Sequence, residues 1–167
     1  MVNTARRPAE DFICGFGLFI LSDRAMLPTE YKTGAGYHYS TEPIYEFDYH
    51  NRDALIAALK DALGRRNPFI ETPSSKQLKT KTAMERRARA NSWTDLQRKS
   101  IGFLIQCWKS DFIVEAWGRA GNGGWESENN PALSVSIPAQ SGIEAVADAI
   151  LDHLNKRNDL PGMVRSA

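Results

Sequence analysis

Runs of hydrophobic residues divide the chain into short strands and amphipathic helices. Residues 12–21 are almost continuously apolar but include two glycines, which predicts a buried strand that another backbone approaches closely. Alternating apolar residues over 101–108, a polar turn and a second apolar run over 112–118 predict a β-hairpin. Residues 133–137 alternate again, so the sequence predicts a three-stranded antiparallel meander in this part of the chain.

Apolar residues spaced three and four positions apart identify two longer helices, at 52–67 and 143–158. The first follows a weakly alternating strand at 44–49. The second is expected to begin at an N-cap, Ser141, with Glu144 at the third position of the helix.

The two strand-and-helix segments also match each other at an offset of 91 residues. The identical helix positions are Ala54, Ala58, Asp61, Leu63, Arg66 and Asn67 with Ala145, Ala149, Asp152, Leu154, Arg157 and Asn158. Chance explains such matches in Ala- and Leu-rich helices as readily as internal duplication does, and both explanations stay open.

The remaining stretches lack a clear period. Residues 22–43 are rich in Gly, Thr and Tyr and are expected to form a long irregular loop, of a kind that is often functional. Residues 67–76 contain two prolines and are expected to form a connector. Two sequences of capping-box form, Thr82–Glu85 and Ser92–Asp95, predict two short helices after it, and residues 1–10 have the character of a loose terminus.

These elements predict an α+β fold, with a mainly antiparallel sheet packed by amphipathic helices in one domain over residues 1–167. A hydrophobic share of 42% and a charged share of 25% are typical of a globular protein. The net charge of +1 is unevenly distributed, because residues 76–99 alone carry eight basic and two acidic side chains. We therefore expect one basic and one acidic face, although helices with solvated surfaces give the same count.

Cys14 and Cys107 both fall in apolar runs and are expected to be buried reduced thiols. The apolar run at 12–21 is too short to cross a bilayer, and no small-x-small cleavage site follows it. We therefore expect a cytoplasmic protein without a membrane partner.

Convergent catalytic groups are scarce in this sequence. The three histidines have no metal-binding spacing, and Thr33–His38 lacks the lysine and the context of a phosphate loop, so a flexible turn is the better interpretation. We expect no enzyme activity, no metal site and no cofactor.

A protein-binding surface is the stronger prediction. Trp125 lies between glycines and carboxylates, which is the usual environment of an interface anchor; the equal alternative is a ring that folds back over the sheet. The candidate protein-binding residues are Trp125, Glu126, Glu128, Tyr37, Tyr39, Glu42, Glu46 and Asp48.

Two alternatives remain. A nucleic-acid-binding accessory protein would use the basic segment 76–99, with Trp93 as a stacking face. Its candidate phosphate contacts are Lys79, Lys81, Arg86, Arg87 and Arg89. A small-molecule enzyme would need a pocket built around residues 22–43.

In its general make-up the chain resembles a bacterial immunity protein of the contact-dependent growth inhibition type. The resemblance lies in a small α+β chain without enzyme motifs, the meander over 101–137, the helix over 141–156 and the aromatic and acidic loop 124–128. It implies a cytoplasmic protein that binds the C-terminal toxin domain of its own system, often a nuclease such as a tRNase, and blocks its active site. No binding residue is carried over, because no motif aligns.

Overall fold

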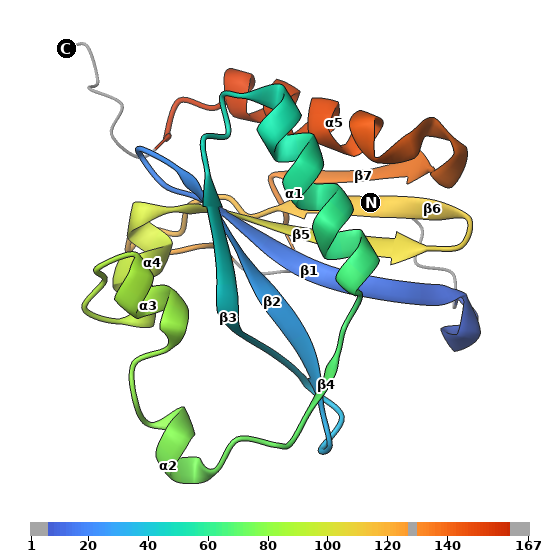
Figure 1. Ribbon diagram of the computed structural model, residues 1–167. Helices are drawn as coiled ribbons and strands as arrows, with labels where there is room; N and C mark the ends of the chain where they lie inside the picture. The colour runs from blue at the N-terminus through green and yellow to red at the C-terminus, as the bar shows by residue number, and fades with distance from the viewer. Residues whose placement is uncertain (1–6, 127–129, 161–167) are drawn as a thin grey trace, which may run out of the picture.

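The computed structural model describes residues 7–126 and 130–160 (Figure 1). Its strands are β1 (Phe12–Ile20), β2 (Ala25–Thr33), β3 (His38–Phe47), β4 (Phe69–Ile70), β5 (Ile101–Trp108), β6 (Asp111–Ala116) and β7 (Leu133–Pro138). Its α-helices are α1 (Arg52–Arg65), α2 (Ser75–Leu78), α3 (Ala83–Arg87), α4 (Trp93–Lys99) and α5 (Gly142–Lys156). Short 3₁₀ turns, η1 (Ala9–Asp11) and η2 (Ala139–Ser141), precede β1 and α5. The α+β class and the meander of β5, β6 and β7 are confirmed.

The sheet is built from two similar halves that meet at its centre. Its strand order is β3-β2-β1-β5-β6-β7, with β4 added beside β2, and β1 pairs with β5 in an antiparallel ladder. Each half is therefore three antiparallel strands followed by a helix, α1 after β3 and α5 after β7. The two matching sequence segments occupy equivalent places, at the two outer strands and the helices that follow them.

One face of the sheet is covered by α1 and α5, which lie next to each other (Figure 1). Leu55, Ile56 and Leu59 of α1 and Val146 and Ile150 of α5 pack on the inward residues of the central strands. Burial of this apolar surface is the main stabilising contribution to the fold. Among the described residues, no helix is long and apolar enough to cross a membrane.

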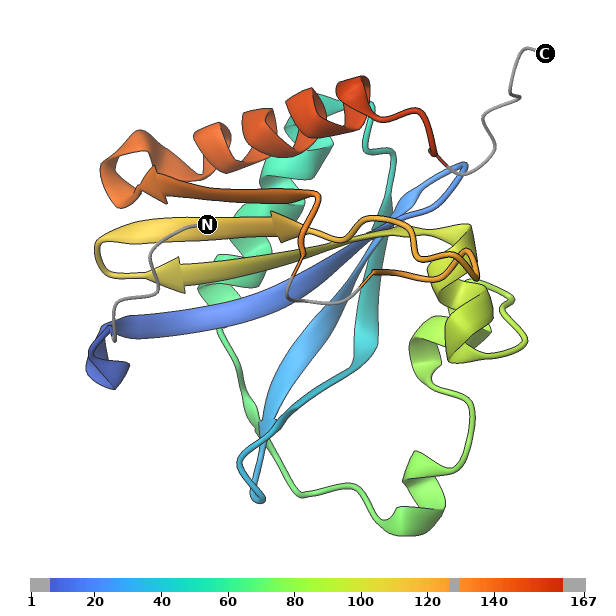
Figure 2. The same ribbon diagram turned by 180° about the vertical axis from the view of Figure 1, so that it is seen from behind.

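The opposite face is only partly covered. The short helices α3 and α4 pack at one end of it, where Met84 and Leu96 contact Phe19, Met26 and nearby apolar residues in a second, smaller core. Figure 2, drawn from this side, shows β1, β5 and β6 without a helix in front of them. On this face Leu104, Gln106 and Trp108 of β5 are half-buried instead of fully buried.

The prediction of a long irregular loop over residues 22–43 is wrong. Most of it forms β2 and the first part of β3, which pair with each other and are joined by a turn over residues 33–37. The Thr and Tyr residues of this stretch have high β propensity. Pro28 is unusual within a strand and interrupts the alternating pattern that would have indicated β2. The register of the β2–β3 pair shifts just after it, as at a β-bulge.

Three smaller expectations also need correction. Ser141 makes no side-chain cap to α5, because η2 runs directly into that helix. The connector over 67–76 contains β4 and the start of α2, which the sequence analysis did not predict. The capping box at Thr82 is confirmed, whereas Asp95 bonds to the backbone of Asn91 instead of completing a box with Ser92.

The expected loose terminus, residues 1–10, falls partly outside the described residues. From Arg7 onward the chain is placed, and Arg7 pairs with Asp111 through two side-chain contacts. This pair holds the pKa of Asp111 below its usual range.

β2 pairs with β1 only near its first residues. β1 pairs with β2 at only two register positions, near Phe19 and Ile20, and then diverges from it. The amide of Asn67 bridges the gap: it accepts from Gly15 N at 3.0 Å and donates to the carbonyls of Gly15 and Glu30 at 2.8 and 3.0 Å. One side chain thus replaces part of a missing ladder.

We predict that Asn67→Ala lowers the free energy of unfolding by about 2–3 kcal/mol, because it leaves these backbone groups without their partner. The effect is measured by urea denaturation monitored by circular dichroism. Asn155→Ala, at an exposed position of α5, is the control and should change stability by less than about 0.5 kcal/mol. Equal stability of the two variants would contradict the bridging role.

Candidate functional site: a tryptophan cavity and a basic pocket

A cavity of about 390 Å³ lies on the partly open face of the sheet. We call it the tryptophan cavity. Its lining residues are Gly17, Phe19, Glu30, Ser40, Trp93, Gln97, Phe103, Leu104, Trp117, Trp125 and Glu126. They come from both sides of the gap between β1 and β2, from β3 and β5, from α4 and from the loop after β6. No Lys, Arg or His is among them.

Trp125 folds back onto the sheet, which is the second of the two arrangements that its sequence context allowed. Its indole Nε1 donates to the carbonyl of Ser100 at 3.2 Å, and the ring lies over Gly102. A Cβ at Gly102 would meet ring atoms of Trp125 at 2.5 Å, so only glycine leaves room for the ring. Arg119 holds the same loop by donating to the Ser100 carbonyl at 2.7 Å.

The rings of the cavity are arranged in two orientations. Trp117 and Trp125 are stacked, with planes 7° apart and centroids 5.2 Å apart. Trp93 stands nearly perpendicular to Trp125, at 78° and 6.1 Å, and Phe19 contacts both Trp93 and Trp125. Trp93 is 43% exposed, so part of its ring remains available to a ligand.

The fourth tryptophan lies on the same face but outside the cavity. Alternation along β5 turns Phe103, Ile105 and Cys107 toward α1 and α5, and Trp108 the other way. Phe12 packs against Trp108 edge-on, and Arg7 lies over its ring at 5.3 Å.

Two carboxylates line the tryptophan cavity. Glu30 comes from β2 and accepts a hydrogen bond from the hydroxyl of Ser40. Burial raises the pKa of Glu30, and the Ser40 hydrogen bond opposes part of that rise. Glu126 comes from the loop after β6 and accepts from the amide of Asn130 at 3.0 Å. Neither carboxylate forms an ion pair with a described residue.

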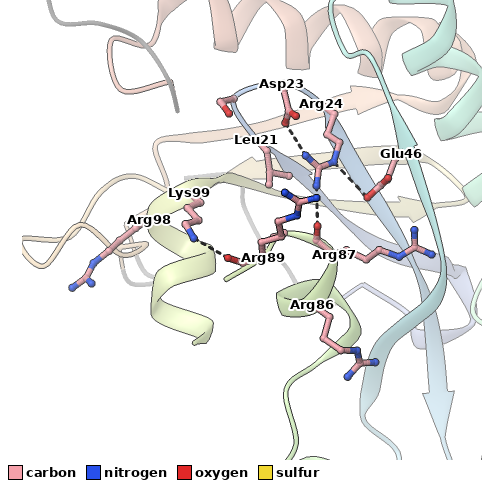
Figure 3. A pocket seen from close by; sticks show the side chains of 11 residues that line it. Leu21, Asp23, Arg24, Glu46, Arg86, Arg87, Arg89, Arg98 and Lys99 are labelled. Carbon is pink, nitrogen blue, oxygen red and sulfur yellow. Dashed lines mark hydrogen bonds and ion pairs between the residues drawn. The ribbon is translucent and has the colours of Figure 1, made fainter. Parts of the chain in front are cut away.

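A second, larger hollow of about 890 Å³ lies beside α3 and α4, and we call it the basic pocket (Figure 3). Its lining includes the cations Arg24, Arg86, Arg87, Arg89, Arg98 and Lys99 and the anions Asp23 and Glu46. Of the predicted phosphate contacts, Arg86, Arg87 and Arg89 lie here and Lys79 and Lys81 do not.

Most cationic side chains of the basic pocket already form hydrogen bonds or ion pairs within the chain. Arg24 donates to the carbonyl of Arg87 at 2.9 Å and pairs with Asp23 and Glu46. Lys99 donates to the carbonyl of Arg89 at 3.0 Å, as Figure 3 shows. Arg98 is directed away from Arg24 in Figure 3 and donates to the carbonyl of Asn122 at 2.9 Å.

Glu42 and Glu46 do not form an acidic surface separate from the basic segment. Glu42 pairs with Arg87 at 2.9 Å and Glu46 pairs with Arg24 at 3.4 Å, so these carboxylates adjoin the basic segment. Asp48 contacts the ring of His50 at 3.0 Å. Because the short helices pack against β3, the structure brings together charges that the sequence analysis had assigned to opposite faces.

The candidate tyrosines line neither the tryptophan cavity nor the basic pocket. Tyr37 is exposed in the turn between β2 and β3, and Tyr39 lines a groove beside β4 and α2. Glu128 lies outside the described residues. Of the predicted toxin-binding residues that the structure describes, Trp125 and Glu126 alone line the tryptophan cavity.

Other expectations concern metals and thiols. The described residues contain no group of three or more His, Cys, Asp or Glu side chains placed to hold a metal ion. Cys14 and Cys107 are buried free thiols at paired positions of β1 and β5, and burial with its neighbouring thiol raises the pKa of Cys107.

The convergence of Glu30, Trp117 and Trp93 in one site was not predicted from the sequence. The available signal was the set of glycines within strands, Gly15, Gly17 and Gly102, since a strand glycine often marks a close approach by another group. The approaching group at Gly102 is the Trp125 ring.

Comparison by sequence finds no matching family model and no matching curated protein. Among solved structures, the fold is similar to that of a protein of unknown function, NMB0488, from Neisseria meningitidis. The two share 10% sequence identity with a TM-score of 0.59, over 90% of this chain and 98% of that one. At this identity the likeness concerns the fold alone.

We predict that Gly102→Ala displaces the Trp125 ring and destabilises the protein by about 1–3 kcal/mol, because the new methyl group would overlap it. Thermal unfolding and a red shift of tryptophan emission report the change. Gly64→Ala in α1, where a Cβ meets nothing within 4 Å, is the matched control and should stabilise by about 0.5–1 kcal/mol. Unchanged tryptophan emission in Gly102→Ala would exclude a position of the Trp125 ring over Gly102.

The raised pKa of Glu30 predicts a pH dependence. The folded protein holds this proton more tightly than the unfolded chain, so ionisation of Glu30 reduces stability as pH rises through the folded pKa. Glu30→Gln should therefore be more stable than the parent protein at pH 7. The difference should disappear below about pH 4, where the unfolded carboxyl is also protonated.

Urea unfolding from pH 3 to 8 measures this difference. Glu71→Gln, at an exposed position before α2, is the control for the loss of one negative charge. A Glu30→Gln variant that is less stable than the parent protein at pH 7 would show that the charged form of Glu30 is favoured in the fold.

Proposed function

We propose that this chain is an immunity protein that binds the C-terminal toxin domain of its own system and occludes the toxin's active site. The proposed toxin is a nuclease, such as a tRNase, and the proposed site of action is the cytoplasm. In this proposal the chain is an inhibitor without catalytic activity of its own, and the tryptophan cavity is the centre of its binding surface.

One observation carries the proposal: the tryptophan cavity combines indole rings with two carboxylates and no cationic side chain. Aromatic side chains in partly desolvated sites are the residues that contribute most to protein interfaces. A nuclease must bind phosphates, so its active-site groove is basic, and an aromatic and acidic surface is complementary to it.

The rigidity of the surface also supports an inhibitor. The ring of Trp125 is fixed by a hydrogen bond and by stacking on Trp117, and the loop that carries it is held by Arg119. A preformed surface loses little conformational entropy on binding, which favours tight complexes.

The basic pocket favours a second candidate, a nucleic-acid-binding accessory protein. Three of its arginines, Arg86, Arg87 and Arg89, belong to the predicted phosphate-binding set, and the pocket carries four more positive than negative side chains. In this candidate, backbone phosphates would occupy the pocket and binding would weaken steeply with salt.

We predict that this chain restores the growth of cells that express the C-terminal toxin domain of its own system, and that it forms a stable one-to-one complex with that domain. Glu126→Lys should weaken that complex by at least about tenfold, because it places a cation against a basic groove. The double variant Arg86→Glu, Arg89→Glu should bind the toxin normally. Growth rescue and calorimetric titration measure the two effects.

The same variants decide between the candidates. If the chain acts on nucleic acid, the double variant loses affinity for a single-stranded RNA oligonucleotide whereas Glu126→Lys retains it. Absence of both rescue and complex at micromolar concentrations would refute the immunity proposal.

A further inference from the structure

We propose that the tryptophan cavity takes one cationic side chain of the bound toxin, an arginine guanidinium, between its indole rings and the carboxylates of Glu30 and Glu126. This inference rests on the proposed function and names the chemical group that the cavity recognises. A cation of the toxin's phosphate-binding groove would then be held by the inhibitor instead of by substrate.

The aromatic walls fit a flat cation. Trp117 and Trp125 stack on each other, so the facing surfaces of these two rings are already in contact. Trp93 meets Trp125 at 78° and is 43% exposed, so its ring offers the most accessible indole surface of the cavity. Ring faces attract cations electrostatically, and tryptophan does so most strongly. A guanidinium can also stack flat on an indole, which an ammonium cannot do. No cation of the described residues occupies these faces, although Arg7 and Arg65 do lie over Trp108 and Tyr45.

The carboxylates supply the charge that the rings lack. Glu30 is partly buried in the cavity wall, and among the described residues it accepts a side-chain hydrogen bond from the Ser40 hydroxyl. The nearby His38 ring also favours its charged form but forms no ion pair with it. A carboxylate withdrawn from water without a counter-ion is stabilised when a cation arrives. Arginine presents several N–H donors in a fork, so one guanidinium can meet both a carboxylate and a ring.

The apolar part of the lining fits the rest of such a side chain. Phe19 and Leu104 line the cavity between the polar groups and can contact the methylene stem of an arginine. The other hollows differ: the basic pocket is rich in cations, and the groove beside β4 contains Lys81 and Arg86 but no tryptophan. The combination of indole rings with carboxylates that form no ion pair with a described residue therefore distinguishes the tryptophan cavity from both.

The test is an NMR titration of the full chain with Nα-acetyl-arginine amide, following the indole N–H signals. Signals of Trp93, Trp117 and Trp125 should shift at millimolar ligand, and that of Trp108, outside the cavity, should not. Nα-acetyl-citrulline amide has nearly the same shape without the charge and should leave all four signals in place. Glu30→Gln and Glu126→Gln should each weaken arginine binding roughly three- to tenfold.

Arg89→Gln, in the basic pocket, is the matched control and should leave arginine binding unchanged. Equal shifts with the citrulline amide, or shifts confined to Trp108, would overturn the cation site. If the parent protein and both glutamate variants bind the toxin with equal affinity, the cation site is overturned as well, while the immunity function stands. Conversely, arginine binding by a chain that forms no toxin complex would keep the cation site and remove the toxin as the source of its ligand.

Discussion

The divergence of β1 from β2 is the constraint on which the rest of this structure depends. β1 pairs with β5 along almost all of its length, and it leaves β2 after two residue pairs. The backbone groups exposed by that separation need partners, and the Asn67 amide supplies them. On the open face the same separation leaves a hollow between Gly17 and Glu30, which becomes the floor of the tryptophan cavity. The strand geometry that requires Asn67 thus also creates the candidate site.

The predictability of the fold differed between its two halves. The second half was predicted well because its hydrophobic pattern is clear: apolar residues alternate along β5, β6 contains the apolar run Phe112–Val114, and a short polar turn joins the two strands. In the first half, β2 and β3 contain Pro28, Pro43 and many tyrosines and threonines, so hydrophobic periodicity failed although β propensity was high. The equivalence of β3–α1 with β7–α5 was the one sequence observation that related the halves, and the structure places both pairs at corresponding positions.

The candidate site was predictable only in part, for a physical reason. Trp125 and Glu126 could be selected because local sequence marks them, as an aromatic and a carboxylate in a glycine-rich loop. Trp93, Trp117 and Glu30 come from three other parts of the chain, and nothing in their own neighbourhoods indicates that they converge. Their meeting follows from tertiary packing, in which α4 docks at the end of the open face and β2 turns its carboxylate into the gap. The ion pairs of Glu42 and Glu46 in β3 could not be predicted for the same reason, since the packing of other elements determines their partners.

The distribution of charge makes the cavity the stronger candidate surface. The basic segment contains three short helices, which leave many carbonyl groups without helical partners. Long cations satisfy several of these: Lys81 donates to Ala90, Arg86 to Lys81 and Lys99 to Arg89. Cations near the C-terminal turns of α3 and α4 are also favoured by the helix dipoles. Packing of the segment therefore explains much of its positive charge without any ligand. The carboxylates of the tryptophan cavity have no comparable explanation, because neither forms an ion pair with a described residue. Burial of Glu30 costs stability, and the hydrogen bond from Ser40 and the nearby His38 ring offset only part of that cost. A charge that the fold does not use for its own stability is the better indication of a partner.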